Sequence, residues 1–241
     1  PFCKKEKSIV AVGNTGVLGY HNISVDSFPA RDGKHCPGAE ARQAALKLRE
    51  KANMAKQAKI RFGAIGCGGM GTHRIKQMVS HELGVELVAA VDIDPPRLDN
   101  LAEVIGSNAF VRYTGVNDYK RMIDENELDA VGIFTPHIPH YDHLKYALLK
   151  GRNVLIEKPM VCGAANALEV TKLAKDKGVT ALLTYQRHYE LKFMKARELI
   201  AKGAIGDLTN FFVYMAQDWC GRTWRGEPEF SGGGQINDSG S

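Results

Sequence analysis

The sequence predicts an α/β fold, with a doubly wound parallel sheet followed by the start of a second domain. Two observations support this prediction. Six short, β-branched apolar runs alternate with helical segments over residues 59–184, and the alternation weakens after Thr184. Strand–helix–strand units of this kind form parallel sheets with right-handed crossovers. We therefore expect one sheet domain over residues 59–184 and a domain boundary near Tyr185.

Each expected element has a local signal. Apolar runs bounded by polar or turn residues predict strands, and segments that begin with Pro or end with Gly predict helices. The expected strands are residues 60–65, 86–91, 110–113, 130–134, 153–156 and 180–184. The expected helices between them are residues 73–80, 95–105, 119–126, 140–149 and 164–177.

The segments on either side of the sheet domain have a different character. Residues 1–58 read as an N-terminal extension, in which residues 39–58 are rich in Ala, Lys and Arg and predict a helix. Residues 185–241 read as the beginning of a substrate domain. Within it we expect a helix over residues 191–201 and a strand with one exposed face over residues 208–215.

Composition excludes several classes of protein. The chain has 241 residues, of which 44% are hydrophobic and 24% charged, so it is neither disordered nor fibrous. No apolar run approaches the roughly 18 residues that span a membrane, and a net charge of +5 is too balanced to indicate nucleic-acid binding. We therefore expect a soluble protein with no membrane or nucleic-acid partner.

The cysteines and histidines give no signal for a metal site. Five cysteines without a C-x-x-C pair indicate reduced thiols and a cytoplasmic protein. An export signal over residues 4–19 is the alternative, although four glycines dilute its apolar part. His137, His140 and His143 are spaced by three and interrupted by Pro139, which argues against a metal.

A glycine-rich turn lies between the first expected strand and the first expected helix. Residues 66–71 read Gly-Cys-Gly-Gly-Met-Gly, which places Gly66, Gly68 and Gly71 in a G-x-G-x-x-G pattern. Such glycines allow a tight turn, close approach of a pyrophosphate and close helix packing, and the phosphates bind at the helix N-terminus. A purely structural turn is the alternative for the glycines alone. We expect Gly69 and Met70, inside the pattern, to contact the cofactor too.

An acidic residue strengthens the prediction of dinucleotide binding. Asp92 ends the second strand, 26 positions after Gly66, where a carboxylate can accept hydrogen bonds from the adenosine ribose. Residues 93–95 include no Arg that could hold a 2′-phosphate, so we expect NAD rather than NADP. A second glycine series over residues 13–19 is not followed by a helical pattern, and we expect no ligand there.

Two further motifs end strands at the same edge of the sheet. The fourth strand is followed by Thr135 and Pro136, with His140 four residues later, and the fifth by Glu157, Lys158 and Pro159. Carboxyl ends of parallel strands face the ligand crevice. Lys158 could exchange a proton with a substrate hydroxyl, although an exposed structural lysine is the alternative.

Together these motifs resemble the family of glucose–fructose oxidoreductase, inositol dehydrogenase and MocA. The resemblance rests on the glycine turn, Asp92, Thr135-Pro136 with His140, and Glu157-Lys158-Pro159, and it extends through residues 184–187, 203–206 and 232–234. It implies a Rossmann domain followed by a mostly antiparallel sheet domain, and NAD(P)-dependent oxidation or reduction of sugars, cyclitols or related polyols. It also implies a homo-oligomer when the protein is complete.

The resemblance assigns roles to individual residues. Lys158 matches the active-site lysine and Asp238 the aspartate of the family's D-x-x-x-H element, whose His acts as general acid/base. Here the chain stops at Ser241, one residue before that His would fall. The matched residues from the motifs at strands four and five would bind the cofactor, namely Thr135, Pro136, His140, Glu157 and Lys158. Lys158 and Arg187 would bind substrate, with a domain-junction hydrogen-bond network as the alternative for Arg187.

Two alternatives to a dehydrogenase remain open at this point. Some relatives are glycosidases that keep NAD bound and use transient oxidation, and the Gly- and Trp-bearing end of the chain is compatible with that activity. The chain could also be a non-catalytic dinucleotide-binding fragment, because the position that matches the family's catalytic His would fall after Ser241. Net NADH formation distinguishes a dehydrogenase from both alternatives.

Overall fold

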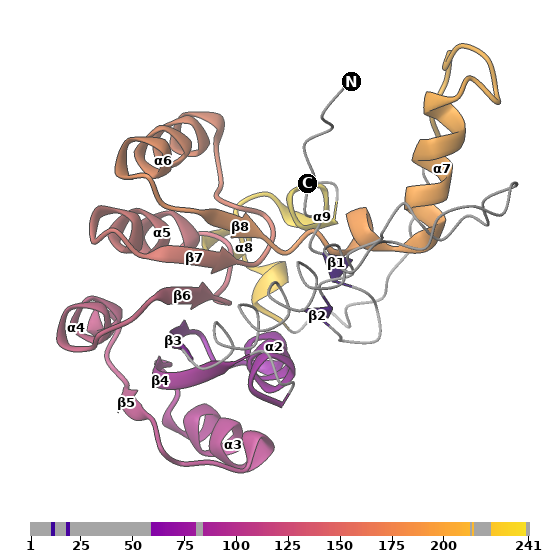
Figure 1. Cartoon of the computed structure of the whole chain (residues 1–241). Helices are drawn as coiled ribbons and strands as arrows, with labels where there is room; N and C mark the ends of the chain where they lie inside the picture. Colours follow the sequence, from indigo (N-terminus) through magenta and orange to yellow (C-terminus); the bar gives the residue numbers. More distant parts are fainter. Residues whose placement is uncertain are drawn as a thin grey trace, which may run out of the picture.

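A six-stranded parallel sheet forms the centre of the protein (Figure 1). The computed structural model describes residues 11–12, 18–19, 59–80, 84–212, 214 and 223–239. The sheet order is β5-β4-β3-β6-β7-β8, and all neighbouring strands are parallel. Its strands are β3 (Ile60–Ile65), β4 (Val85–Val91), β5 (Val111–Tyr113), β6 (Ala130–Ile133), β7 (Asn153–Ile156) and β8 (Ala181–Leu183). The predicted doubly wound sheet is therefore confirmed.

Five helices connect these strands and cover both faces of the sheet. Their bounds are α2 (Gly69–Ser80), α3 (Pro95–Ile105), α4 (Asp118–Glu125), α5 (His140–Leu149) and α6 (Ala164–Lys177). In Figure 1, α2 and α3 lie together on one side of the sheet, and α4, α5 and α6 lie on the other. This layered arrangement is the one that crossover connections of a single hand produce.

Two clusters of buried side chains fill the spaces between the sheet and its helices. One cluster packs the sheet against α4, α5 and α6, with Met122, Leu144 and Val170 among its members. The other packs the sheet against α2 and α3 around Ile75 and Leu101, which are fully buried. Burial of these apolar side chains stabilises the sheet domain and fixes the carboxyl edge on which the site is built.

The chain changes direction within the sheet between β3 and β6. From β3 it runs outward through β4 to β5, and it then returns to β6 on the other side of β3. In open parallel sheets, ligands bind beyond the carboxyl ends of the strands at such a switch point. The two strands that meet there end at Ile65 and Ile133, directly before the glycine-rich turn and the Thr135-Pro136 segment.

The described residues after β8 form short helices. These are η2 (Gln186–Tyr189), α7 (Leu191–Ala201), η3 (Trp224–Gly226), α8 (Pro228–Ser231) and α9 (Gly234–Ser239). In Figure 1, α7 projects away from the sheet, whereas α8 and α9 come back to it. The backbone N–H of Ile138 donates to the carbonyl of Phe230 at 3.1 Å, which ties α8 to the loop after β6.

One expected element differs from the structure. Residues 208–212 of the strand expected over 208–215 have no strand geometry, and no described strand lies beside them. A strand needs a partner for its backbone N–H and C=O groups, so an alternating pattern alone is insufficient. The helix expected over residues 39–58 lies outside the described residues, as does most of the second glycine series, which the antiparallel pair β1 (Ala11–Val12) and β2 (Leu18–Gly19) flanks.

The other boundaries agree with the sequence to within a few residues. The largest difference is at α2, which begins at Gly69 rather than at residue 73, so the helix starts inside the glycine-rich turn. In the described part of the chain, no helix is long and apolar enough to cross a membrane.

Candidate active site

The glycine-rich turn between β3 and α2 has the geometry of a phosphate-binding loop. Gly66 has a φ of +89°, and a Cβ at this position would lie 2.9 Å from the backbone of Phe134. A Cβ on Gly71 would overlap the carbonyl oxygen of Gly66, so α2 packs directly against the turn. A Cβ on Gly68, in contrast, would meet only the Arg97 guanidinium, at 3.5 Å. Gly68 therefore presents open backbone at the helix N-terminus, where an anion is favoured.

Asp92 lies beside this turn, directly after β4. Its side chain is buried, and its two carboxylate oxygens accept hydrogen bonds from the backbone N–H of Cys67 at 2.7 Å and of Asp94 at 3.0 Å. The carboxylate thereby fixes the turn, and its oxygens retain lone pairs for a ribose hydroxyl. The open glycine, the helix N-terminus and the adjacent carboxylate together fit a dinucleotide such as NAD.

The structure corrects the reason for expecting NAD rather than NADP, which was that residues 93–95 include no Arg. Arg97, in the first turn of α3, places its Nη1 3.8 Å from Asp92 Oδ1. It also pairs with Asp94 at 3.2 Å. An arginine therefore does lie beside the adenosine end of the predicted site, and the preference for NAD has to rest on other observations.

Lys158 and Asp238 meet at the carboxyl edge of the sheet. Lys158 Nζ donates hydrogen bonds to the Asp238 carboxylate and, at 2.9 Å, to the Asp238 backbone carbonyl. The Asp238 side chain is 3% exposed and that of Lys158 is 24% exposed. The lysine therefore reaches solvent while its partner is buried. The two residues that the family resemblance assigns to catalysis are thus in direct contact, 80 positions apart in the sequence.

Two further residues surround the Asp238 carboxylate. Arg225 Nε donates to Asp238 Oδ2 at 2.8 Å, and His137 Nε2 lies 3.6 Å from Asp238 Oδ1. Burial raises the pKa of Asp238, but the hydrogen bonds from Lys158 and Arg225 outweigh that effect, and the pKa lies below its usual value. The carboxylate is therefore ionised at neutral pH. It can hold the ammonium group of Lys158 in place and stabilise a positive charge beside it.

His137 is a structural residue of the same cluster. Its side chain is 3% exposed, its Nδ1 lies 3.0 Å from the carbonyl of Ser231, and Trp224 packs edge-on against its ring at 4.7 Å. Burial lowers the pKa of His137. Through Ser231 and Trp224, the neutral imidazole joins the loop after β6 to α8 and η3. These contacts help to position Asp238 at the sheet edge.

The structure places His140 in the core, at the start of α5. The ring is fully buried, and its nitrogens face the carbonyls of Pro159 at 2.8 Å and Thr135 at 3.0 Å. Burial lowers the pKa of His140, so the neutral ring donates to one carbonyl at a time. His140 therefore joins the two loops that follow β6 and β7, and any cofactor contact from this region comes from Thr135 and Pro136, which are half-buried.

His143, one turn further along α5, supports Thr135 from below. Thr135 Oγ1 and His143 Nδ1 are 3.2 Å apart, and Tyr119 packs edge-on against the imidazole at 4.4 Å. Burial lowers the pKa of His143 to about 4. The ring is therefore neutral at physiological pH and fixes the orientation of the Thr135 hydroxyl at the crevice.

Glu157 connects the lysine segment to the helix that starts at the glycine turn. Its Oε1 accepts from Arg74 Nε of α2 at 3.0 Å, and its Oε2 accepts from the backbone N–H of Lys158 at 3.3 Å. Both side chains of the ion pair are largely buried, at 15% exposure for Arg74 and 11% for Glu157. Glu157 was predicted from the sequence as a cofactor-binding residue, whereas Arg74 was not predicted.

The other predicted site residues lie in exposed positions. Met70 is 48% exposed at the start of α2, next to Gly69, and Arg187 is exposed in η2, beyond the end of β8. Sequence reasoning missed Arg74, Arg97, Arg225 and His137. Only Arg74 had a local signal, because it lies one helical turn after the glycine pattern on the helix that the pattern starts.

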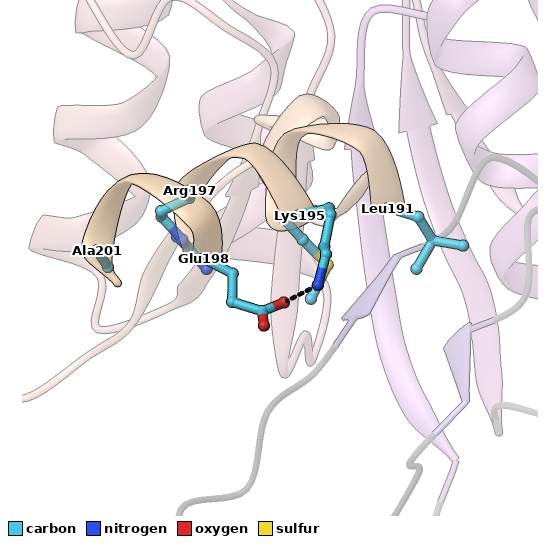
Figure 2. Close-up of a pocket in the computed structure, with 6 residues that line it drawn as sticks. Leu191, Lys195, Arg197, Glu198 and Ala201 are labelled. Atoms are coloured by element: carbon cyan, nitrogen blue, oxygen red, sulfur yellow. Dashed lines mark hydrogen bonds and ion pairs between the residues drawn. The ribbon is translucent and has the colours of Figure 1, made fainter. Parts of the chain in front are cut away.

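A hollow of about 680 Å³ lies elsewhere, along one side of α7 (Figure 2). Its lining comes from that helix alone, and Figure 2 shows the Lys195–Glu198 pair, 3.1 Å apart, projecting from it. This open face holds no cluster of groups suited to catalysis. Among the described residues, no three His, Cys, Asp or Glu side chains gather in a metal-binding arrangement.

Two family models match the chain. Residues 60–185 match the model described as the oxidoreductase family with an NAD-binding Rossmann fold, and residues 193–241 match the GFO/IDH/MocA C-terminal domain. The first match covers the whole six-stranded sheet, the glycine turn and Lys158. The second begins at α7 and includes Arg225 and Asp238.

The individual proteins to which the chain is similar include a sugar reductase and a sugar dehydrogenase. The chain is 25% identical over 150 residues to dTDP-3,4-didehydro-2,6-dideoxy-alpha-D-glucose 3-reductase of Streptomyces antibioticus, covering 62% of this chain and 44% of that protein. It is 28% identical over 178 residues to D-xylose 1-dehydrogenase (NADP(+)) 2 of Haloferax volcanii, covering 73% and 53%. The chain thus spans about half the length of these relatives.

Solved structures agree with this fold. Myo-inositol 2-dehydrogenase from Lactobacillus plantarum superposes with a TM-score of 0.55 and 29% identity, covering 62% of this chain and 43% of that one. GenD2 from gentamicin A biosynthesis, solved in complex with NAD, superposes with a TM-score of 0.61 and 24% identity over 76% of this chain and 51% of that one. The second likeness concerns the fold alone.

Proposed function

The chain belongs to the Gfo/Idh/MocA oxidoreductase family, and on that premise we propose that the protein transfers a hydride between NAD and a CH–OH group of a sugar, cyclitol or related polyol. The observation that carries this proposal is the pairing of Lys158 with the buried Asp238 at the sheet edge that also carries the glycine turn. Names of relatives support the substrate class, since they include reductases and dehydrogenases of sugars and inositols.

Cofactor binding would use the residues on the two sides of the switch point. The backbone around Gly68 and the N-terminus of α2 would hold the pyrophosphate, and Asp92 the adenosine ribose. Thr135 and Pro136 would line the nicotinamide end, supported from below by His140 and His143. When bound, the nicotinamide supplies a carbon that accepts or donates hydride.

Lys158 would move the proton that accompanies this transfer. Its ammonium group, held by Asp238, is placed to donate a hydrogen bond to a substrate hydroxyl, and its neutral form could accept the hydroxyl proton. Asp238 would keep the lysine in position and stabilise its charged form, and Arg225 would orient Asp238. Arg187 would contact the substrate from the exposed side of the crevice.

The proposal includes a cytoplasmic homo-oligomer. Reduced thiols support the location, because Cys67 and Cys162 are both free in the structure. The family membership supports assembly through the second domain, since residues 193–241 match the model of the family's C-terminal domain.

NADH formation with a panel of sugars and inositols tests the proposed reaction. The assay follows absorbance at 340 nm with NAD⁺ for the complete wild-type protein, its Lys158→Met variant and, as a matched control, Lys177→Met at the exposed end of α6. We expect turnover in the complete wild type and the control, and its loss in Lys158→Met with NADH binding retained. Undiminished turnover in Lys158→Met contradicts the role of the lysine.

The same panel separates the two other activities that the sequence leaves open. Release of nitrophenol from nitrophenyl glycosides without net NADH formation would identify a glycosidase. Binding of NADH without turnover of any compound would identify a dinucleotide-binding chain that is not catalytic. Either result would replace the dehydrogenase proposal for this chain.

A further inference from the structure

A largely buried ion pair links the helix that begins in the glycine-rich turn to the segment that carries Lys158. Arg74 lies on α2, one turn after the glycines, and Glu157 directly precedes Lys158. Their contact of 3.0 Å joins residues 83 positions apart and crosses from the helix after β3 to the end of β7. Among the described residues, Arg74 is the cation that lies at ion-pair distance from Glu157.

The charge of Glu157 lies beside Lys158, the residue that would move a proton in the proposed reaction. For the proposed reaction, the substrate carbon must contact both the nicotinamide and, through its hydroxyl, the Lys158 amine. Glu157 follows the same strand, and its carboxylate accepts from the Lys158 backbone N–H at 3.3 Å. With the nicotinamide bound at the end of β7, a charge on Glu157 would lie near the ring, in a region where burial weakens screening by solvent.

The two redox forms of the cofactor differ in charge at this end. The oxidised nicotinamide ring carries a positive charge and the reduced ring carries none. A lone Glu157 carboxylate would favour the oxidised form, whereas a carboxylate neutralised by Arg74 would favour neither form strongly.

We propose that the Arg74–Glu157 pair sets the preference of the site for NAD⁺ relative to NADH, because Arg74 balances the charge of the carboxylate that directly precedes Lys158 in the chain. This inference rests on the proposed function, because it requires the nicotinamide at the end of β7. It makes Arg74 a positioning residue. Arg74 holds Glu157, and through it the Lys158 backbone, against the helix whose N-terminus would hold the pyrophosphate.

Binding measurements with four variants test the charge balance. The dissociation constants of NAD⁺ and NADH are measured by calorimetry at pH 8.5, where carboxylates are ionised. The proteins are the wild-type chain, Arg74→Gln, Glu157→Gln, the double variant and the conservative Arg74→Lys. Thermal melting of each variant shows whether it is folded.

The single variants should change the preference in opposite directions. Arg74→Gln leaves an unbalanced carboxylate and should shift the affinity ratio toward NAD⁺ by at least about three- to tenfold, since unit charges about 4 Å apart change an equilibrium by about fivefold even when water screens them fully. Glu157→Gln leaves an unbalanced guanidinium and should shift the ratio toward NADH by a similar factor. The double variant should return to within about twofold of the wild type, and Arg74→Lys should preserve the ratio.

The opposite signs separate electrostatics from structural damage. If the pair only holds the fold together, each single variant weakens NAD⁺ and NADH equally, and an unchanged ratio overturns the proposal. If Arg74→Gln does not fold, Glu157→Gln and the double variant still test the proposal. The proposal requires that Glu157→Gln shifts the affinity ratio toward NADH and that the double variant reverses this shift. If the wild-type chain binds neither form, the proposed function fails together with this inference.

Discussion

Lys158 and Asp238 lie 80 positions apart in the sequence, and the structure joins them by two hydrogen bonds from the lysine ammonium group to one aspartate. The contact connects the strand end that carries Glu157-Lys158-Pro159 to α9, near the end of the described chain. Arg225 and His137 complete the surroundings of the carboxylate. The catalytic proposal therefore depends on residues 223–239 docking against the sheet domain.

Asp238→Asn should weaken this docking. The substitution removes the negative charge that Lys158 and Arg225 both contact and leaves two largely buried cations without it, a change that costs about 1–3 kcal/mol. The Ile138 amide, which donates to Phe230 at 3.1 Å, reports the docking by hydrogen exchange. We expect it to exchange at least about tenfold faster in Asp238→Asn.

The matched control for this experiment is Asp176→Asn, which alters an exposed pair with Lys172 on α6. It should leave the exchange of Ile138 unchanged, because exposed ion pairs contribute little to stability. Equal protection of Ile138 in the wild type and Asp238→Asn would show that the carboxylate does not hold α8 and α9 in place.

Gly71→Ala should destabilise the sheet domain, whereas Gly68→Ala should not. A Cβ on Gly71 overlaps the Gly66 carbonyl, which is backbone and cannot move aside cheaply. Overpacking of this kind costs about 1–3 kcal/mol. A Cβ on Gly68 makes an ordinary contact at 3.5 Å with the exposed side chain of Arg97. Thermal or urea unfolding of the two variants measures the difference, and equal stability would contradict the described packing of α2 against the turn.

His143 should make the protein less stable as the pH falls from 6.5 to about 4. Burial lowers the pKa of His143 to about 4 in the folded state, and in the unfolded chain it is near 6.5. The unfolded state therefore takes up a proton first, and the free energy of unfolding falls by about 3 kcal/mol across this interval. Stability is fully present above pH 6.5 and is lost toward the folded-state pKa.

Urea unfolding at a series of pH values measures this loss. His143→Gln keeps a hydrogen-bonding partner for Thr135 but cannot titrate, so its stability should depend less steeply on pH. His73→Gln, at an exposed position on α2, serves as the control and should keep the wild-type slope. A slope in His143→Gln equal to that of the wild type would show that His143 does not bind its proton preferentially in the unfolded state.

Much of the sheet domain could be predicted from sequence, because its signals are local. Apolar runs bounded by Gly and Pro located the strands, and the glycine pattern after β3 together with Asp92 after β4 located the switch point. The helix start at Gly69 was missed because two glycines at the beginning of α2 conceal its helical pattern. The strand expected from residue 208 was wrong over residues 208–212, because alternation predicts a strand only where a neighbouring strand is present.

The arginines of the site could not be predicted in the same way. Arg74, Arg97 and Arg225 each act across an interface between elements, at distances of 3.0, 3.8 and 2.8 Å from Glu157, Asp92 and Asp238. Long side chains reach such partners from any neighbouring helix, so sequence spacing does not identify the carboxylate that each arginine contacts. Lys158 was a candidate from its place after the fifth strand, whereas Asp238 was identified only through the family resemblance.

Binding of NADH to Gly68→Ala tests the central claim most directly. The claim is that the turn at Gly68 and the N-terminus of α2 hold the cofactor pyrophosphate. The substitution places a methyl group where the backbone must approach the phosphates, while the fold tolerates it. Calorimetric titration of the wild-type chain and of Gly68→Ala with NADH should show binding by the wild type and affinity at least about tenfold weaker in the variant, at an unchanged melting temperature. Equal affinity for NADH in the two proteins would contradict the account.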